Sequence, residues 1–99
     1  MGRRRSVEAV PSYLVEAFLP RGATGERRTR ENRARSVAEG LTRPWTRVRF
    51  DRSIHVPEDE ICFFVFDAPS SREAAFVADQ AALDPIRVVE AISSEEEQQ

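Results

Sequence analysis

The most apolar stretch of the chain runs from Ile61 to Phe66 and predicts a β-strand, because its residues are β-branched or aromatic apart from one cysteine. A strand with one face in water alternates apolar and polar residues, and this stretch does not. Alternation places Ile61, Phe63 and Val65 on one face and Cys62, Phe64 and Phe66 on the other. We therefore expect helices of the same chain to cover one face and a second copy to cover the other, which makes the protein a homodimer.

Five further elements are predicted from periodicity and from turn and cap residues. They are a strand from Tyr13 to Leu19, a helix from Thr24 to Leu41, a strand from Trp45 to Val56, a helix that follows the Ser70/Glu73 capping box and ends at Asp84-Pro85, and a strand from Ile86 to Ile92. Pro57-Glu58-Asp59 forms the turn before the apolar strand. The order β-α-β-β-α-β predicts an α+β fold, a ferredoxin-like sandwich whose helices cover one sheet face.

The same patterns predict which residues share a surface. In the second strand, Val48, Phe50, Ile54 and Val56 share an apolar face, and Arg47, Arg49, Asp51, Ser53 and His55 share a polar one, as in an edge strand. The buried helix stripes are Ala34, Val37, Ala38 and Leu41, then Ala74, Val77, Ala78 and Ala81. The N-terminal half of the first helix is polar all round, so we expect it to fray or project.

Composition and charge limit the extent of the domain, the possible partners and the location of the protein. Residues 1–11 and 93–99 lack apolar periodicity and are predicted to be flexible tails around one domain, 12–92. Residues 1–52 hold 13 arginines against six acidic residues, and residues 53–99 hold two against 11. The acidic second half and the missing glycine-rich RNA-binding octamer argue against nucleic acid. With one cysteine, no signal peptide and no membrane-length apolar run, the expected location is cytoplasmic, without a membrane partner.

The first candidate site pairs Glu16 with Glu90. The first and last strands of a ferredoxin-like sheet are neighbours, so we expect the two carboxylates side by side on the open face, in a cavity also lined by Phe64 and Arg49. Two close carboxylates repel each other, which raises the pKa of one of them. Such a pair suits general acid–base chemistry or the binding of a hard metal ion. The alternative is that each is paired with Arg47, Arg49 or an arginine of the second copy across the dimer contact.

The second candidate is a metal site at His55, with Asp51 and Cys62. Asp51 and His55 are expected on the same strand face, but four residues of strand separate them by roughly 13 Å. They need further ligands from a neighbouring strand or from the second copy to hold one ion. The alternative is that His55 is an ordinary surface residue.

A family resemblance covers about residues 12–92. The segments Tyr13-Leu14-Val15-Glu16, Val48-Arg49-Phe50, Val56-Pro57-Glu58-Asp59-Glu60, Cys62-Phe63, Phe66-Asp67-Ala68-Pro69-Ser70 and Val89-Glu90-Ala91 resemble the DUF4242 family. Its members include small actinobacterial nickel-binding proteins. The resemblance implies a ferredoxin-like domain that dimerises through its open sheet face, as in dimeric α/β barrels, with nickel as a ligand. Relatives commonly carry a second cysteine at the position of Phe64, and an aromatic or aliphatic residue at His55.

Two functional hypotheses remain. The first is a non-catalytic binding protein, a homodimer whose inter-sheet cavity takes a metal ion or a small molecule. The second is a small enzyme of monooxygenase or isomerase type that uses Glu16 and Glu90. The sequence contains no phosphate-binding loop, dinucleotide fingerprint, nucleophile elbow or Cys-x-x-Cys motif. It therefore favours binding over catalysis.

Overall fold

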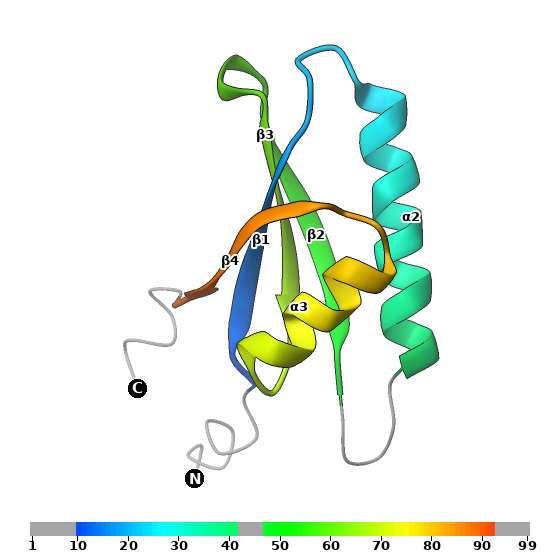
Figure 1. Cartoon of the computed structure of the whole chain (residues 1–99), viewed down its shortest axis with the longest axis vertical. Coiled ribbons are helices and arrows are strands. Elements are labelled where there is room, and N and C mark those ends of the chain that lie inside the picture. Colours follow the sequence, from blue (N-terminus) through cyan, green and yellow to red (C-terminus); the bar gives the residue numbers. More distant parts are fainter. Residues whose placement is uncertain (1–9, 42–46, 93–99) are drawn as a thin grey trace, which may run out of the picture.

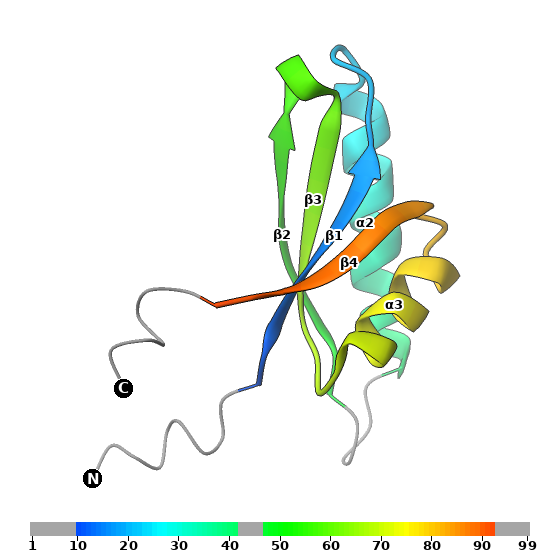
Figure 2. The same cartoon turned by 60° about the vertical axis from the view of Figure 1, so that its left-hand side comes forward.

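The computed structural model describes residues 10–41 and 47–92, which form one sheet and two helices. The elements are β1 (Ser12–Phe18), α2 (Thr24–Leu41), β2 (Arg49–Val56), the 3-10 turn η1 (Pro57–Asp59), β3 (Ile61–Asp67), α3 (Ser71–Gln80) and β4 (Pro85–Ala91). Neighbouring strands are antiparallel, in the order β2-β3-β1-β4. Both helices lie on the same side of the sheet (Figures 1 and 2). This α+β arrangement is compatible with the predicted ferredoxin-like fold. Trp45, with which the second strand was predicted to begin, and the predicted tails at 1–9 and 93–99 lie outside the described residues.

The core lies between the sheet and the two helices. Its largest fully buried side chains include Phe64, Phe66, Leu19 and Leu83. Small side chains on the helices allow close approach to the sheet, and they are the ones that the periodicity predicted: Ala34 and Ala38 on α2, and Ala74 and Ala78 on α3. The apolar stripes therefore position both helices as expected.

The arginines of α2 hold the helix in place instead of projecting from it. Arg30 donates a hydrogen bond from Nη1 to the carbonyl of Phe18 at 3.0 Å. Arg33 donates to the carbonyls of Ala81 (2.7 Å) and Ala82 (3.1 Å), beyond the end of α3. The expectation that the N-terminal half frays or projects is wrong, because guanidinium groups can satisfy backbone carbonyls that apolar side chains cannot.

A β-bulge in β2 changes which of its residues face the helices. Phe50 lies opposite Phe66 and Arg52 lies opposite Val65, so Asp51 is an extra residue in the ladder. Before the bulge, Val48 and Phe50 point into the core, as predicted. After the bulge the alternation is inverted, and Ser53 and His55 take the helix side while Ile54 and Val56 take the other. The single apolar face predicted for the whole strand is therefore wrong.

The connection from α3 to β4 contains a residue in the left-handed region. Ala82 has φ of +57°, and the amide of Leu83 returns to the carbonyl of Ala78 at 3.0 Å, which closes a Schellman-type helix end. Glycine adopts this conformation without the steric cost that alanine meets.

We expect Ala82→Gly to raise the free energy of unfolding by about 0.5–1 kcal/mol, measured by urea denaturation. The matched control is Ala75→Gly within α3, which should lose about 1 kcal/mol because the same change there lowers helix propensity. Destabilisation by both substitutions would contradict this explanation of the turn.

Candidate functional site

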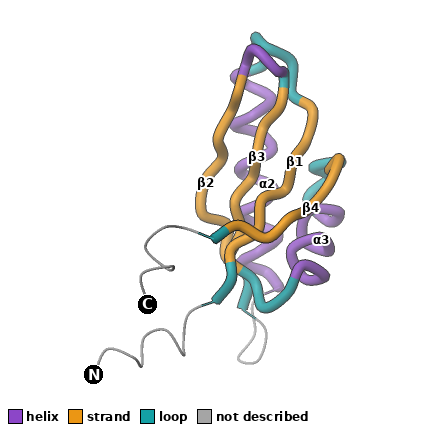
Figure 3. The backbone as a smooth tube through the Cα atoms, turned by 90° about the vertical axis from the view of Figure 1, so that its left-hand side faces the viewer, coloured by secondary structure: helices purple, strands orange, loops and turns teal. Residues whose placement is uncertain are grey.

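The sheet surface that faces away from α2 and α3 is the candidate site, here called the open face. Figure 3 looks onto it, with the helices behind the strands. The strand registers arrange the side chains of the open face in four rows, and each row crosses the strands in the order β2, β3, β1, β4. The first row is Val56, Ile61, Phe18; the second is Ile54, Phe63, Glu16, Arg87; the third is Arg52, Val65, Leu14, Val89; the fourth is Arg49, Asp67, Ser12, Ala91.

The open face is apolar at its centre and at the η1 end. Val65 is 6% exposed, whereas Phe18 is 53% and Ile54 is 42% exposed. Leu14, Ile61, Phe63 and Val89 are half-buried. No helix of the described chain covers these side chains (Figure 2). A contiguous apolar surface of this kind is typical of a contact surface for a protein or a ligand.

The charged groups of the open face are paired with one another. Arg87 Nε lies 2.7 Å from Glu16 Oε1, and Arg49 Nη2 lies 2.6 Å from Asp67 Oδ2. Arg52 pairs with the bulge residue Asp51 at 2.6 Å. Each of the three arginines in the rows therefore faces a carboxylate, and the face carries no net charge from these pairs.

The predicted Glu16–Glu90 pair does not form. Glu16 lies opposite Phe63 and Arg87, on the open face, whereas Glu90 lies opposite Tyr13, whose side chain is buried on the helix side. Because successive residues of a strand point to opposite faces, the two carboxylates are on different sides of the sheet. The partner of Glu16 is Arg87 of its own chain, and not Arg47 or Arg49, which the alternative had named.

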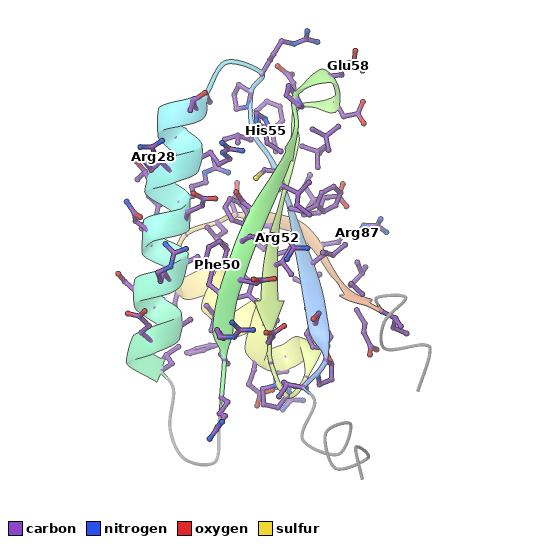
Figure 4. All side chains as sticks on the ribbon, turned by 180° about the vertical axis from the view of Figure 1, so that it is seen from behind. Arg28, Phe50, Arg52, His55, Glu58 and Arg87 are labelled. Atoms are coloured by element: carbon purple, nitrogen blue, oxygen red, sulfur yellow. The ribbon has the colours of Figure 1, made fainter. Side chains whose placement is uncertain are left out.

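The two remaining cavity candidates separate in the same way. Arg49 is on the open face, in the row with Asp67 and Ser12. Phe64 is on the helix side, fully buried, with its ring centroid 6.4 Å from that of Phe50. Phe64 is therefore a core residue and cannot line a cavity on the open face. Its neighbour Phe63 takes that place. In Figure 4, Phe50 lies toward α2 and Arg87 lies on the opposite side of the sheet.

The predicted metal ligands are also dispersed. The bulge puts His55 on the helix side, with Nε2 3.4 Å from the carbonyl oxygen of Leu19, at the end of the sheet near Glu58 (Figure 4). Asp51 is in an ion pair with Arg52, which lies on the open face, whereas His55 lies on the helix side. Asp51 and His55 therefore do not share a face as predicted. Cys62 lies opposite His55 and is fully buried. Within residues 10–41 and 47–92, no three His, Cys, Asp or Glu side chains are grouped closely enough to hold a metal ion.

The thiol of Cys62 lies in a mixed environment beneath α2. Burial raises its pKa, while the guanidinium of Arg27 and a hydrogen bond with Ser53 act in the opposite direction. The hydroxyl of Ser53 in turn donates to the carboxylate of Glu31 on α2. A buried thiol with a raised pKa is a poor nucleophile and a poor metal ligand at neutral pH.

We expect the stability of the wild type to fall above pH 9 more steeply than that of Cys62→Ala. The folded-state pKa of Cys62 is raised above the ordinary value of 9.0, so between the two values the unfolded chain releases a proton that the folded chain keeps. Rising pH therefore favours unfolding through this group. Urea denaturation of both proteins at pH 7 and pH 10 measures the difference, and parallel losses would contradict it. Comparing slopes cancels the titration of groups that the two proteins share.

Three residues of the open face were not singled out as candidates from the sequence: Phe18, Phe63 and Arg87. The signal for Arg87 was available, since opposite charges favour cross-strand positions on antiparallel strands and Glu16 needed a partner. The signal for the bulge was Asp51, because aspartate is depleted in regular strands and marks irregularities there. Recognising it would have placed Ile54 on the same face as Phe63.

Comparisons with known proteins give no relative: no family model, curated protein or solved structure matches the chain. Neither described helix is both long and apolar enough to cross a membrane.

Proposed function

We propose that the protein is a small binding protein that acts as a homodimer, with the open faces of two copies packed against each other and a small molecule held between them. This is the dimeric α/β-barrel type of assembly that the resemblance to DUF4242 implies. The observation that carries the proposal is the open face itself, which is apolar from Val65 to Phe18 and is not covered by the helices. Burial of apolar surface contributes about 25 cal/mol per Å², so covering this face is favourable.

A second copy fits this surface better than a charged polymer does. Nucleic acid requires cations that are free to meet phosphates, whereas the arginines of the open face are paired with Asp67, Glu16 and Asp51. Two neutral, largely apolar sheets can pack at the usual separation of about 10 Å between β-sheets.

Sedimentation equilibrium of the full chain tests the assembly. We expect a mass of twice 11.2 kDa at micromolar concentration. A monomer under these conditions would overturn the proposal, because the cavity needs both copies. Native mass spectrometry of protein purified directly from cells should then show additional mass of a few hundred daltons on the dimer, since pockets of this kind hold small ligands.

Binding is favoured over the alternative of a small monooxygenase- or isomerase-like enzyme. That alternative relied on Glu16 and Glu90 as an acid–base pair, and the two lie on opposite faces. The remaining carboxylate of the open face, Glu16, is in an ion pair with Arg87, which favours its ionised form.

We expect nickel binding to be weak or absent, although the family resemblance suggests nickel. Nickel favours imidazole nitrogen, and the only imidazole of the chain, His55, faces a backbone carbonyl on the helix side. Calorimetry with nickel on tag-free protein measures this, and His55→Ala should abolish any residual binding. A submicromolar site that survives His55→Ala would contradict the prediction and assign the ligands to other residues.

A further inference from the structure

The ion pair of Glu16 and Arg87 lies where a second copy packed on the open face would cover it; this inference rests on the proposed homodimer. Glu16 is on β1, a central strand of the sheet, and in the second of the four rows. Among the described residues it is the only carboxylate of the two inner rows. Its neighbours on the same face are Leu14 and Phe18 along β1 and Phe63 on β3. Any packing that buries these apolar side chains also buries Glu16, whichever way the second copy is turned.

The charge at the centre of the open face depends on whether Glu16 carries a proton. Arg87 Nε donates a hydrogen bond to Glu16 Oε1 at 2.7 Å, and 18% of the Glu16 side chain is exposed in the single chain. On its other side β1 pairs with β3, which contributes the uncharged ring of Phe63. The carboxylates of the other two ion pairs lie further out, Asp67 in the outermost fourth row and Asp51 in the bulge of the edge strand β2. Glu16 is therefore the carboxylate that a second copy covers most fully.

Protonation of Glu16 changes what the formation of the dimer must bury. With the carboxylate ionised, each copy contributes a hydrogen-bonded ion pair of zero net charge. With the carboxyl group protonated, each copy contributes a guanidinium without a counter-charge, and a buried charge without a partner is far less stable than a buried pair. Since the dimer contains the site twice, it binds the ionised form of Glu16 more tightly than the protonated form. By linkage, the dimer must weaken as falling pH protonates this carboxylate.

We propose that the ion pair of Glu16 and Arg87 is an acid-sensitive switch of the homodimer. At neutral pH both groups are charged and the two copies stay together. On acidification Glu16 takes up a proton, Arg87 loses its counter-charge, and the dimer separates into folded monomers that release any molecule held between them. The switch works in one direction only, because the guanidinium keeps its proton at alkaline pH and the pair then stays neutral.

Two variants reproduce the two charge states of the site at pH 7. Glu16→Gln has nearly the same shape as the wild type and cannot ionise, so it leaves Arg87 without a counter-charge. Sedimentation equilibrium of the full chain should show that its dissociation constant is raised by about a hundredfold or more. The double variant Glu16→Gln with Arg87→Gln removes both charges, and it should dimerise to within about tenfold of the wild type.

The pH dependence of the same proteins tests the switch directly. Between pH 7 and pH 4 we expect the dissociation constant of the wild type to rise by about tenfold, and that of the double variant to rise clearly less. The matched control is Glu26→Gln, which breaks an ion pair with Arg30 on α2, on the other side of the sheet. It should dimerise as the wild type does at both pH values. Circular dichroism at each pH verifies that the proteins compared are folded.

The outcomes separate the switch from the assembly. A wild-type monomer at pH 7 would overturn the proposed function itself. A wild-type dimer whose dissociation constant is unchanged in Glu16→Gln would overturn the switch alone. So would a double variant that is as weakly dimeric as Glu16→Gln, because the loss would then not come from an unpaired Arg87. Equal pH dependence of the wild type and the double variant would also overturn it, and would assign the acid sensitivity to other carboxylates.

Discussion

Phe64→Ala should remove a large part of the stability of the chain. Phe64 is fully buried between the sheet and the helices, and its ring packs at a tilt against Phe50. Truncation of a buried phenylalanine costs about 3–5 kcal/mol, through lost burial and the cavity left behind. Small domains are stable by only about 5–15 kcal/mol, so the variant should be partly unfolded at 37 °C. Urea denaturation followed by circular dichroism measures the loss.

The neighbouring residue provides the control for this prediction. Phe63→Ala changes the same side chain one position earlier, but on the open face, where Phe63 is half-buried within one chain. Its effect should depend on protein concentration, because the contacts it loses are those to the second copy. The loss in Phe64→Ala should be present at every concentration. Equal, concentration-independent losses in both variants would show that the two faces of β3 are not distinguished as described.

Phe63→Glu should convert the proposed dimer into a folded monomer. The new carboxylate would lie beside Glu16, its cross-strand neighbour, and both would be buried at the centre of the dimer contact. Like charges placed opposite each other on adjacent strands are destabilising, and a buried charge without a partner costs several kcal/mol. Both copies carry the substitution, so the dimer contact contains it twice. We therefore expect the dissociation constant to rise at least a hundredfold, as measured by sedimentation equilibrium.

The control for this variant is Phe76→Glu. Phe76 is 51% exposed on α3, which lies on the other side of the sheet, so the substitution adds the same charge at a place that the proposed dimer leaves in water. It should remain dimeric and keep its circular dichroism spectrum. If Phe63→Glu also remained dimeric, the open face would not be the contact surface, and the proposal would fail.

Much of the fold was predictable because its signals are local. The helix stripes at Ala34 and Ala38 and at Ala74 and Ala78 follow directly from periodicity, as does the alternation in β3. Ser70 was correctly predicted to precede the second helix, although its hydroxyl contacts the Glu73 carboxylate instead of capping a backbone amide. The order of the elements then limits the sheet to few topologies.

The candidate site was much less predictable, because it depends on register. A single extra residue, Asp51, moves Ser53 and His55 to the helix side of β2 and Ile54 to the open face. The pairing of β4 with β1 sets Arg87, and not Glu90, beside Glu16. Side chains alternate with a period of two along a strand, so an offset of one residue transfers every later side chain to the other face. Asp51 marks an irregularity in β2, but the pairing with β3 is what sets the size of the offset.

The sequence by itself therefore determined the elements, their order and the fact that both faces of β3 are apolar. Each of these depends on residues that are close together in the chain. The tertiary structure decided which face of each strand is buried. The helices cover only one side of the sheet, and packing of Phe64, Phe66 and Val15 beneath them selects the register in which Phe63, Glu16 and Arg87 meet on the other. That choice is made by long-range burial, which outweighs the local preferences of the individual strands.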